Sequence, residues 1–280
     1  MIDFSDCAFS DILYSGSEKK TGILYRDEAY MLKFRKVVNG QPSYSHISEY
    51  LASHIIKTTG LDVHDTLLGI YKGQEVVAVK DFTAGTGETL VEFSSTGDSS
   101  FDTEREKHTV YSYREIEYLL EQHTKVIARQ ELVRRFWEMF IVDAFIANFD
   151  RHGYNWGFLK GISSYRLAPI YDNGSSLFPR LQDEELDRIL NSQEELDKRT
   201  YHFPTSQILL DGKKSSYYEV INNGDFAGCK EAEKKITDKI DFKKIDKCID
   251  ETAFISENRK EFYKLILRYR YKHIFHKEVE

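Results

Sequence analysis

The chain has 280 residues, of which 41% are hydrophobic and 14% are aromatic. It is long enough to bury a sizeable core and contains no biased repeat, so the sequence excludes a disordered chain and a solenoid. The net charge of −7 does not supply the broad positive field on which non-specific nucleic-acid binding depends. We therefore expect a globular protein that does not bind nucleic acid directly.

We expect neither a membrane span nor a secretion signal in this sequence. No stretch approaches the roughly 20 consecutive apolar residues that a membrane span needs, and the first residues are acidic where a secretory signal is basic. We expect a cytoplasmic protein without a membrane partner, with export as an effector as the alternative. Cys7, Cys229 and Cys248 show no CxxC spacing and are expected to be reduced thiols.

The first hundred residues carry strand and turn signals. Two short runs of β-type residues within 21–36 predict a hairpin. Residues 48–59 show helical spacing, and Gly60 provides a stop. Residues 67–71 and 76–80 then predict a second pair of strands. This order indicates a β-rich region with a single helix.

The remainder of the chain is mainly helical by pattern. Between residues 83 and 109 the composition shifts to Gly, Ser, Thr, Asp and Glu, which predicts a connection with an exposed insertion. Apolar residues then recur at helical spacing over 113–122 and 129–148. The second of these predicted helices is apolar enough to lie in the centre of a lobe.

A loop with two oxygen-bearing side chains follows this central helix directly. In the loop, Asp150 and Asn155 stand five positions apart. Phosphoryl transfer needs a carboxylate that accepts the proton of the attacking hydroxyl, and an oxygen ligand for magnesium. Asp150 and Asn155 fit these two roles, and the alternative is that they only form a turn.

The chain then returns to the same loop and brings a second acidic residue to it. Residues 156–160 and 165–170 predict a strand pair, which leads to the sequence Tyr-Asp-Asn-Gly. Asp172 is therefore a candidate metal-binding carboxylate that faces Asn155. Gly174 is expected to allow a sharp backbone turn there, and the alternative is a tight turn without a metal.

The segments DRHGYN and LAPIYDNGSSL resemble those of the HipA-type serine/threonine kinases, and within them the shorter CtkA-like proteins. DRHxxN is also similar to the loop of phosphatidylinositol kinases. The resemblance implies a two-lobed, protein-kinase-like α+β fold with a small β-rich N-lobe and a larger, mostly helical C-lobe. It also implies that Asp150 is the catalytic base, that Asn155 and Asp172 bind Mg²⁺, and that His152 and Arg151 support the loop.

On this fold we expect three parts of the chain. The N-lobe takes residues 1–82, the connection and exposed insertion take 83–112, and the C-lobe with the catalytic loop and the metal-binding hairpin takes 113–280.

The resemblance also extends to a phosphate-binding loop near the N-terminus. Ser15, Gly16 and Ser17 lie between two predicted strands, where a Gly-rich loop covers the phosphates of ATP. An exposed hairpin turn is the alternative. The family has a regulatory serine just ahead of this loop, so Ser15 and Ser17 are the candidate autophosphorylation sites.

Two further sets of residues are expected at the nucleotide. Strand alternation turns Lys33 toward the phosphates, and such a lysine is held by an acid of the adjoining helix, for which Glu49 is the candidate. A solvent-facing lysine and a surface glutamate are the alternatives. By position, Lys80, Asp81 and Phe82 fall where the family connects its lobes and offers backbone groups to adenine.

Together these residues predict an ATP- and Mg²⁺-dependent serine/threonine kinase that acts on a protein hydroxyl and phosphorylates itself. The alternatives are a kinase for a lipid or small-molecule hydroxyl, and a nucleotide-binding pseudokinase that works by docking a partner. In the family, the region that touches the antitoxin precedes the phosphate loop, which begins here near residue 15. An antitoxin partner is therefore the less favoured expectation.

Overall fold

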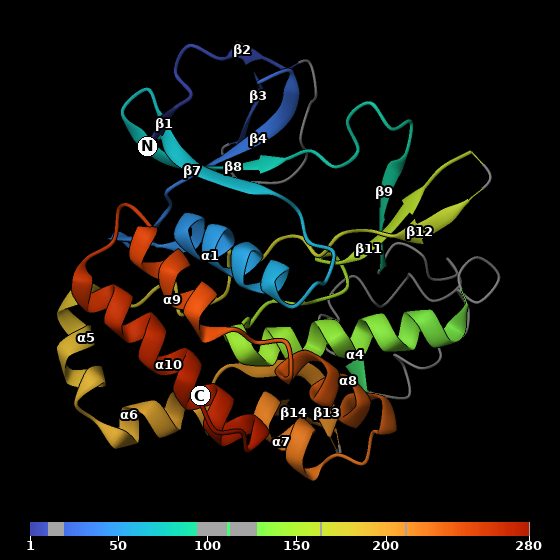
Figure 1. Cartoon of the computed structure of the whole chain (residues 1–280), viewed down its shortest axis with the longest axis vertical. Helices are drawn as coiled ribbons and strands as arrows, with labels where there is room; N and C mark the ends of the chain where they lie inside the picture. The colour runs from blue at the N-terminus through green and yellow to red at the C-terminus, as the bar shows by residue number, and fades with distance from the viewer. Residues whose placement is uncertain (11–19, 94–110, 113–127, 163, 211, 280) are drawn as a thin grey trace. The chain divides into compact units, whose positions relative to one another are not determined.

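The computed structural model describes residues 1–10, 20–93, 111–112, 128–162, 164–210 and 212–279 (Figure 1). Ser15, Gly16 and Ser17 of the predicted phosphate loop lie outside the described residues, as does the predicted helix over 113–122. The chain forms two compact units. Unit 1 comprises Met1–Thr86, Pro169–Asn191 and Asp241–Leu265, and unit 2 comprises Gly87–Ala168, Ser192–Ile240 and Ile266–Glu280.

Unit 1 is built on a six-stranded sheet with the strand order β1-β7-β8-β4-β3-β2. Strand β1 pairs parallel to β7, and all other neighbours in this sheet pair antiparallel. The strands are β1 (Ile2–Asp3), β2 (Ala8–Phe9), β3 (Lys20–Tyr25), β4 (Glu28–Phe34), β7 (Thr66–Tyr71) and β8 (Gln74–Lys80), and a separate pair is formed by β5 (Val37–Val38) and β6 (Gln41–Pro42). The helices are α1 (Ser45–Thr58), α5 (Asp183–Leu190), α9 (Phe242–Glu251) and the first part of α10 (Glu257–Phe275).

Strand alternation in β4 sorts its side chains between the two faces of the sheet. Tyr30, Leu32 and Phe34 join a buried cluster that also contains Phe4. Lys33 points to the other face, where it contacts helix α1. The predicted hairpin of β3 and β4, and the predicted pair of β7 and β8, are both confirmed.

Helix α1 packs against strands β7 and β8 of the sheet (Figure 1). It begins at Ser45, three residues before the predicted start, and ends at Thr58. Its fully buried residues include Ile47, Leu51 and Ile55. Gly60 has a φ of +75°, a conformation that glycine adopts without strain, so the predicted stop is confirmed.

Unit 2 contains two three-stranded sheets and most of the remaining helices. One sheet has the antiparallel order β12-β11-β9, and in the other β10 pairs parallel to β13 and β13 pairs antiparallel to β14. The strands are β9 (Thr89–Glu92), β10 (Tyr111–Ser112), β11 (Gly157–Lys160), β12 (Tyr165–Leu167), β13 (Thr205–Leu210) and β14 (Lys213–Ser216). The helices are α4 (Arg129–Ile146), α6 (Gln193–Asp197), the π-helix η4 (Lys198–His202), α7 (Tyr217–Asn223), α8 (Ala227–Thr237) and the second part of α10.

Helix α4 is the centre of unit 2, as its apolar pattern predicted. Trp137 and Phe145 are fully buried, and Trp137 stacks on Phe226 with 5.2 Å between the ring centroids. The helix ends at Ile146, two residues before the predicted end. Its chain reverses because Ala147 is left-handed, with a φ of +57°, and because the next amide bonds back to the carbonyl of Asp143.

The predicted strand over residues 165–170 is also shorter than expected. Strand β12 stops at Leu167 because the chain then passes into unit 1, where Ile170 forms a parallel bridge with Val63. The predicted lobe boundaries at residues 82 and 113 stay a prediction.

Candidate active site

Lys33 is the centre of the first group of predicted site residues, and this group lies in unit 1. The Nζ atom of Lys33 lies 2.9 Å from Oε2 of Glu49 in α1 and 2.9 Å from Oδ1 of Asp172. Asp172 is 139 positions away in the sequence, and its side chain is 44% exposed. The structure therefore brings one lysine and two carboxylates together on the face of the sheet that β4 turns toward α1.

The backbone around Asp172 is unusual in a way that the sequence did not show. Asp172 itself is left-handed, with a φ of +57°, which is uncommon for a residue with a Cβ. A Cβ built on Gly174 would lie 3.0 Å from Oε2 of Glu49 and 3.2 Å from the carbonyl oxygen of Ser45. The predicted role of Gly174 is therefore wrong: the left-handed residue is Asp172, whereas a side chain at position 174 would be crowded by α1.

The charges in this group shift two pKa values in the direction that preserves the ion pairs. Burial alone lowers the pKa of Lys33, but the carboxylates of Glu49 and Asp172 outweigh burial and raise it above its ordinary value. Burial raises the pKa of Glu49, but Lys33, His64 and the amide of Asn173 outweigh burial and lower it. Both partners are therefore charged at neutral pH.

Three buried residues that the sequence analysis missed surround Glu49. His64 places Nε2 3.0 Å from Oε1 of Glu49, and the amide of Asn173 donates to the same oxygen at 2.9 Å. Ser53 accepts a hydrogen bond from Asn173 Nδ2 at 3.2 Å and lies 2.9 Å from His64 Nε2. Only the position of Asn173, next to Asp172, was a signal for any of them in the sequence.

The second group of predicted site residues lies in unit 2, in the loop after α4. Asn148 is fully buried, and its side chain accepts from the amide of Asp150 at 3.1 Å. Asn155 donates through Nδ2 to the carbonyl of Asp150 at 2.7 Å. Because Nδ2 of Asn155 makes this bond, Oδ1 is the acceptor atom of the same side-chain amide and points the other way. The side chain of Asp150 is 45% exposed.

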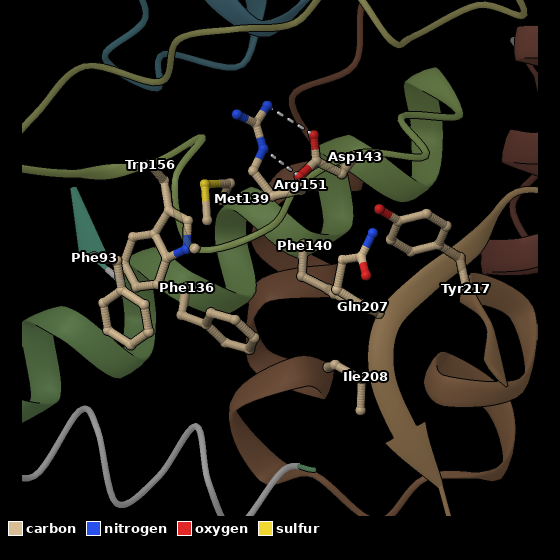
Figure 2. Close-up of a pocket in the computed structure, with 11 residues that line it drawn as sticks. Phe93, Phe136, Met139, Phe140, Asp143, Arg151, Trp156, Gln207, Ile208 and Tyr217 are labelled. Atoms are coloured by element: carbon tan, nitrogen blue, oxygen red, sulfur yellow. Dashed lines mark hydrogen bonds and ion pairs between the residues drawn. The ribbon is translucent and has the colours of Figure 1, made fainter. Parts of the chain in front are cut away.

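A buried ion pair holds this loop in place (Figure 2). Arg151 donates from Nε and Nη2 to the two carboxylate oxygens of Asp143, at 2.8 and 3.0 Å, and from Nη1 to the carbonyl of Asn155 at 2.7 Å. Asp143 also accepts from Nδ2 of Asn148 at 2.9 Å. The pair is thus bonded to the carbonyl of Asn155 and to the side chain of Asn148, two residues of the segment that carries Asp150.

The ion pair lies at a cavity whose other walls are mainly apolar (Figure 2). Besides Asp143 and Arg151, the cavity is lined by Phe93, Phe136, Met139, Phe140, Gly153, Trp156, Gln207, Ile208 and Tyr217. Tyr217 donates to the carbonyl of Asn148 at 2.8 Å, and burial raises its pKa, so it stays a neutral donor. Aromatic packing and these bonds together make the loop rigid.

His152 has a supporting position in the loop. Its Nδ1 accepts from the amide of Tyr154 at 3.2 Å, and its Nε2 lies 3.8 Å from Oδ1 of Asp150. The second distance is too long for a hydrogen bond. His152 and the carboxylate of Asp150 therefore form no hydrogen bond with each other.

The residues predicted to contact adenine have other contacts in unit 1. Lys80 forms an exposed ion pair with Glu28, and the amide of Asp81 donates to the carbonyl of Ala29 at 2.9 Å. The Asp81 carboxylate accepts from residues just after it, as in a turn. Phe82 lies with its ring centroid 6.0 Å from that of Tyr171, the residue before Asp172.

The predicted site residues thus fall into two sets of neighbours. Lys33, Glu49 and Asp172 lie together in unit 1, while Asp150, His152 and Asn155 lie together in unit 2. Within the part of the chain that the structure describes, no group of three or more His, Cys, Asp or Glu side chains forms a metal site. The candidate Mg²⁺ ligands are the oxygens of Asp172 and Asn155, a donor type that Mg²⁺ prefers.

A model of one protein family covers most of the chain: residues 12–251 match the HipA-like C-terminal domain. The serine/threonine-protein kinase CtkA of Helicobacter pylori strain J99 is 37% identical over an aligned length of 276 residues, and the match covers 95% of this chain and 84% of that protein. None of the helices in the described ranges is long and apolar enough to cross a membrane.

Two solved structures resemble the fold. The crystal structure of a Helicobacter pylori proinflammatory kinase CtkA has a TM-score of 0.87 and 35% identity, and the match covers 98% of this chain and 95% of that chain. A chain of the Shewanella oneidensis MR-1 toxin–antitoxin complex of HipA, HipB and operator DNA has a TM-score of 0.59 and 15% identity, with 96% and 68% covered, and so shows the fold alone. The predicted kinase-like α+β fold class and the predicted resemblance are both confirmed.

Gly174→Ala should destabilise the protein through its contact with Glu49. The added methyl group meets Oε2 at 3.0 Å, and overpacking of this kind costs about 1–3 kcal/mol. Urea unfolding of the single variants and of Gly174→Ala combined with Glu49→Ala measures this cost. The cost of the glycine substitution should shrink when Glu49 is absent, and an equal cost in both backgrounds would rule out the contact.

Glu49→Gln should flatten the acid dependence of stability. A lowered folded-state pKa means that the Glu49 carboxylate stabilises the fold above its unfolded pKa of about 4.5, and that this stabilisation is lost as the pH falls toward the folded-state value. Between about pH 6 and about pH 3, the wild type should lose more unfolding free energy than the variant. Glu251→Gln, an exposed glutamate of unit 1, is the matched control and should keep the wild-type slope.

Proposed function

The chain belongs to the HipA-like C-terminal domain family and is a phosphotransferase of the HipA and CtkA-like kinase type, and we propose that it transfers the γ-phosphate of ATP to serine or threonine hydroxyls of proteins with Mg²⁺ as cofactor. The observation that carries this proposal is the contact of Lys33 with both Glu49 and Asp172. In protein kinases the corresponding lysine is held by a helix glutamate and stands beside a metal-binding aspartate.

In this proposal the residues of unit 1 bind the phosphates of ATP. Lys33 neutralises phosphate charge, and Glu49 holds the ammonium group where the phosphates arrive. Asp172 and Asn155 would hold Mg²⁺, which when bound would offset the charge that develops on the transferred phosphoryl group. The exposure of Asp172, at 44%, leaves its carboxylate accessible to a metal ion.

Asp150 is the proposed catalytic base. It orients the acceptor hydroxyl and takes its proton as the hydroxyl oxygen forms a bond to the γ-phosphorus. The bond between that phosphorus and the bridging oxygen of ADP breaks, and ADP leaves. The loop geometry supports this role, because Asn148, Arg151 and Asn155 engage the neighbouring groups while 45% of the Asp150 side chain is exposed.

The proposed adenine contacts are backbone groups of the segment Lys80, Asp81 and Phe82. The amide of Asp81 already donates to Ala29, so the carbonyl oxygens of the segment and the amide of Phe82 are the groups that we propose for adenine. Ser15, Gly16 and Ser17 are proposed to cover the phosphates, and Ser15 or Ser17 to receive phosphate from the enzyme itself.

Asp150→Asn should abolish turnover without abolishing nucleotide binding. Loss of a general base costs about 10²–10⁴-fold in rate, and the amide keeps the size and the hydrogen-bonding shape of the side chain. The measurement uses labelled ATP, Mg²⁺ and a generic protein acceptor, with phosphosites located by mass spectrometry on the acceptor and on the enzyme. Calorimetry should give a Kd for Mg·ATP close to the wild-type value.

Asp225→Asn is the control, because Asp225 is an almost fully exposed acid of the same unit. It should keep wild-type turnover. If Asp150→Asn phosphorylated the acceptor as fast as this control, Asp150 would not be the base. Labelling of vesicles or small alcohols without any labelled protein would instead overturn the proposed acceptor.

A further inference from the structure

We propose that His64 is a positioning residue for phosphoryl transfer, which acts by holding Glu49 in the orientation that presents Lys33 to the nucleotide. The inference rests on the proposed function, since it assigns a role at the same site. His64 lies between helix α1 and strand β7 in the sequence and has no motif around it.

His64 is anchored firmly enough to serve this purpose. Its side chain is almost fully buried, and its amide donates to the carbonyl of Ile170 at 3.0 Å. The preceding residue, Val63, forms the parallel bridge with Ile170. The backbone of His64, just ahead of β7, is therefore fixed to the segment that leads to Asp172.

The hydrogen-bond partners determine which ring nitrogen of His64 carries a proton. Nε2 lies 3.0 Å from Oε1 of Glu49 and 2.9 Å from Oγ of Ser53. The ionised carboxylate can only accept, and the hydroxyl proton of Ser53 is already donated to the carbonyl of Glu49 at 2.7 Å. Nδ2 of Asn173 also lies 3.5 Å from Nε2, but it is nearer to Oγ of Ser53, to which it donates at 3.2 Å. The two closest neighbours of Nε2 therefore both accept, so we assign a proton to Nε2 that faces Oε1 of Glu49 and Oγ of Ser53.

The two carboxylate oxygens of Glu49 therefore have different partners. Oε1 receives His64 Nε2 and the amide of Asn173, whereas Oε2 receives Lys33 at 2.9 Å. With Oε1 held from two sides, the carboxylate cannot rotate about its terminal bond, and Oε2 stays directed at the ammonium group. Without His64, Oε1 keeps one donor in a site that is almost closed to water.

The loss of His64 should shift the position of Lys33 rather than remove its charge. Lys33 has a second carboxylate partner in Asp172, at 2.9 Å. If Glu49 turns away, the ammonium group follows the remaining carboxylate, which is the proposed Mg²⁺ ligand. We therefore expect damage to ATP use, while the affinity for the protein acceptor stays unchanged.

The first experiment compares His64→Leu with His64→Gln. Leucine removes the donor, and glutamine restores an N–H near the position of Nε2. His64→Leu should lower kcat/KM for ATP by about 10- to 100-fold, the usual cost of losing a group that orients another at a metal site. KM for the acceptor should not change, and His64→Gln should recover most of the loss.

The control is His54→Leu, a half-buried histidine of α1 whose Nδ1 contacts the carbonyl of Tyr50 at 2.9 Å. It should keep the wild-type kcat/KM for ATP. Melting temperatures of all variants identify any that fail to fold. A folded His64→Leu protein with wild-type kcat/KM for ATP would overturn the proposal, as would equal losses in His64→Leu and His64→Gln.

A double-mutant cycle separates this role from a general loss of structure and needs no turnover. Calorimetric Kd values for Mg·ATP are measured for the wild type, His64→Leu, Lys33→Ala and the double variant. If His64 acts through Lys33, the His64→Leu substitution should weaken Mg·ATP binding when Lys33 is present. It should have little further effect in the Lys33→Ala protein. Additive effects would overturn the proposal, whereas a wild type that binds no Mg·ATP would instead overturn the proposed function.

Discussion

The charge of Lys33, whose side chain is only 14% exposed, is the interaction on which the arrangement of unit 1 depends. A buried ammonium group costs several kcal/mol unless opposite charges and hydrogen bonds surround it. Here a carboxylate from helix α1 and one from the segment around Asp172 both lie 2.9 Å away. One charge thus fixes a strand, a helix and a distant segment relative to one another, and Gly174 allows the close approach that this requires.

Unit 2 shows the same principle with different residues. Arg151 and Asp143 form a buried pair with two direct hydrogen bonds, and the loop carrying Asp150 is bonded to that pair. In both units an ion pair with a buried carboxylate supports a neighbouring acid that is almost half exposed, Asp172 in one and Asp150 in the other. The buried pairs provide rigidity, and the exposed acids are available for chemistry.

The sequence predicted the elements and the residues whose signals are local. Alternation in β4 predicted which face Lys33 occupies. The kinase pattern, in which an acid of the adjoining helix holds such a lysine, then supplied Glu49 as its partner. His64 could not be found in this way, since its contact with Glu49 links parts of the chain that share no pattern. Gly174 was recognised but misinterpreted, because a sequence does not distinguish a glycine needed for its φ from one needed for close approach.

The proposed function requires that Asp172, Asn155 and Asp150 act on a single ATP. A crystal structure with Mg²⁺ and a non-hydrolysable ATP analogue tests it most directly. The account predicts Mg²⁺ bound to a carboxylate oxygen of Asp172 and to Oδ1 of Asn155, with Lys33 at the phosphates and Asp150 facing the γ-phosphate. A nucleotide bound elsewhere, or a metal ion held without both of these ligands, would contradict the account.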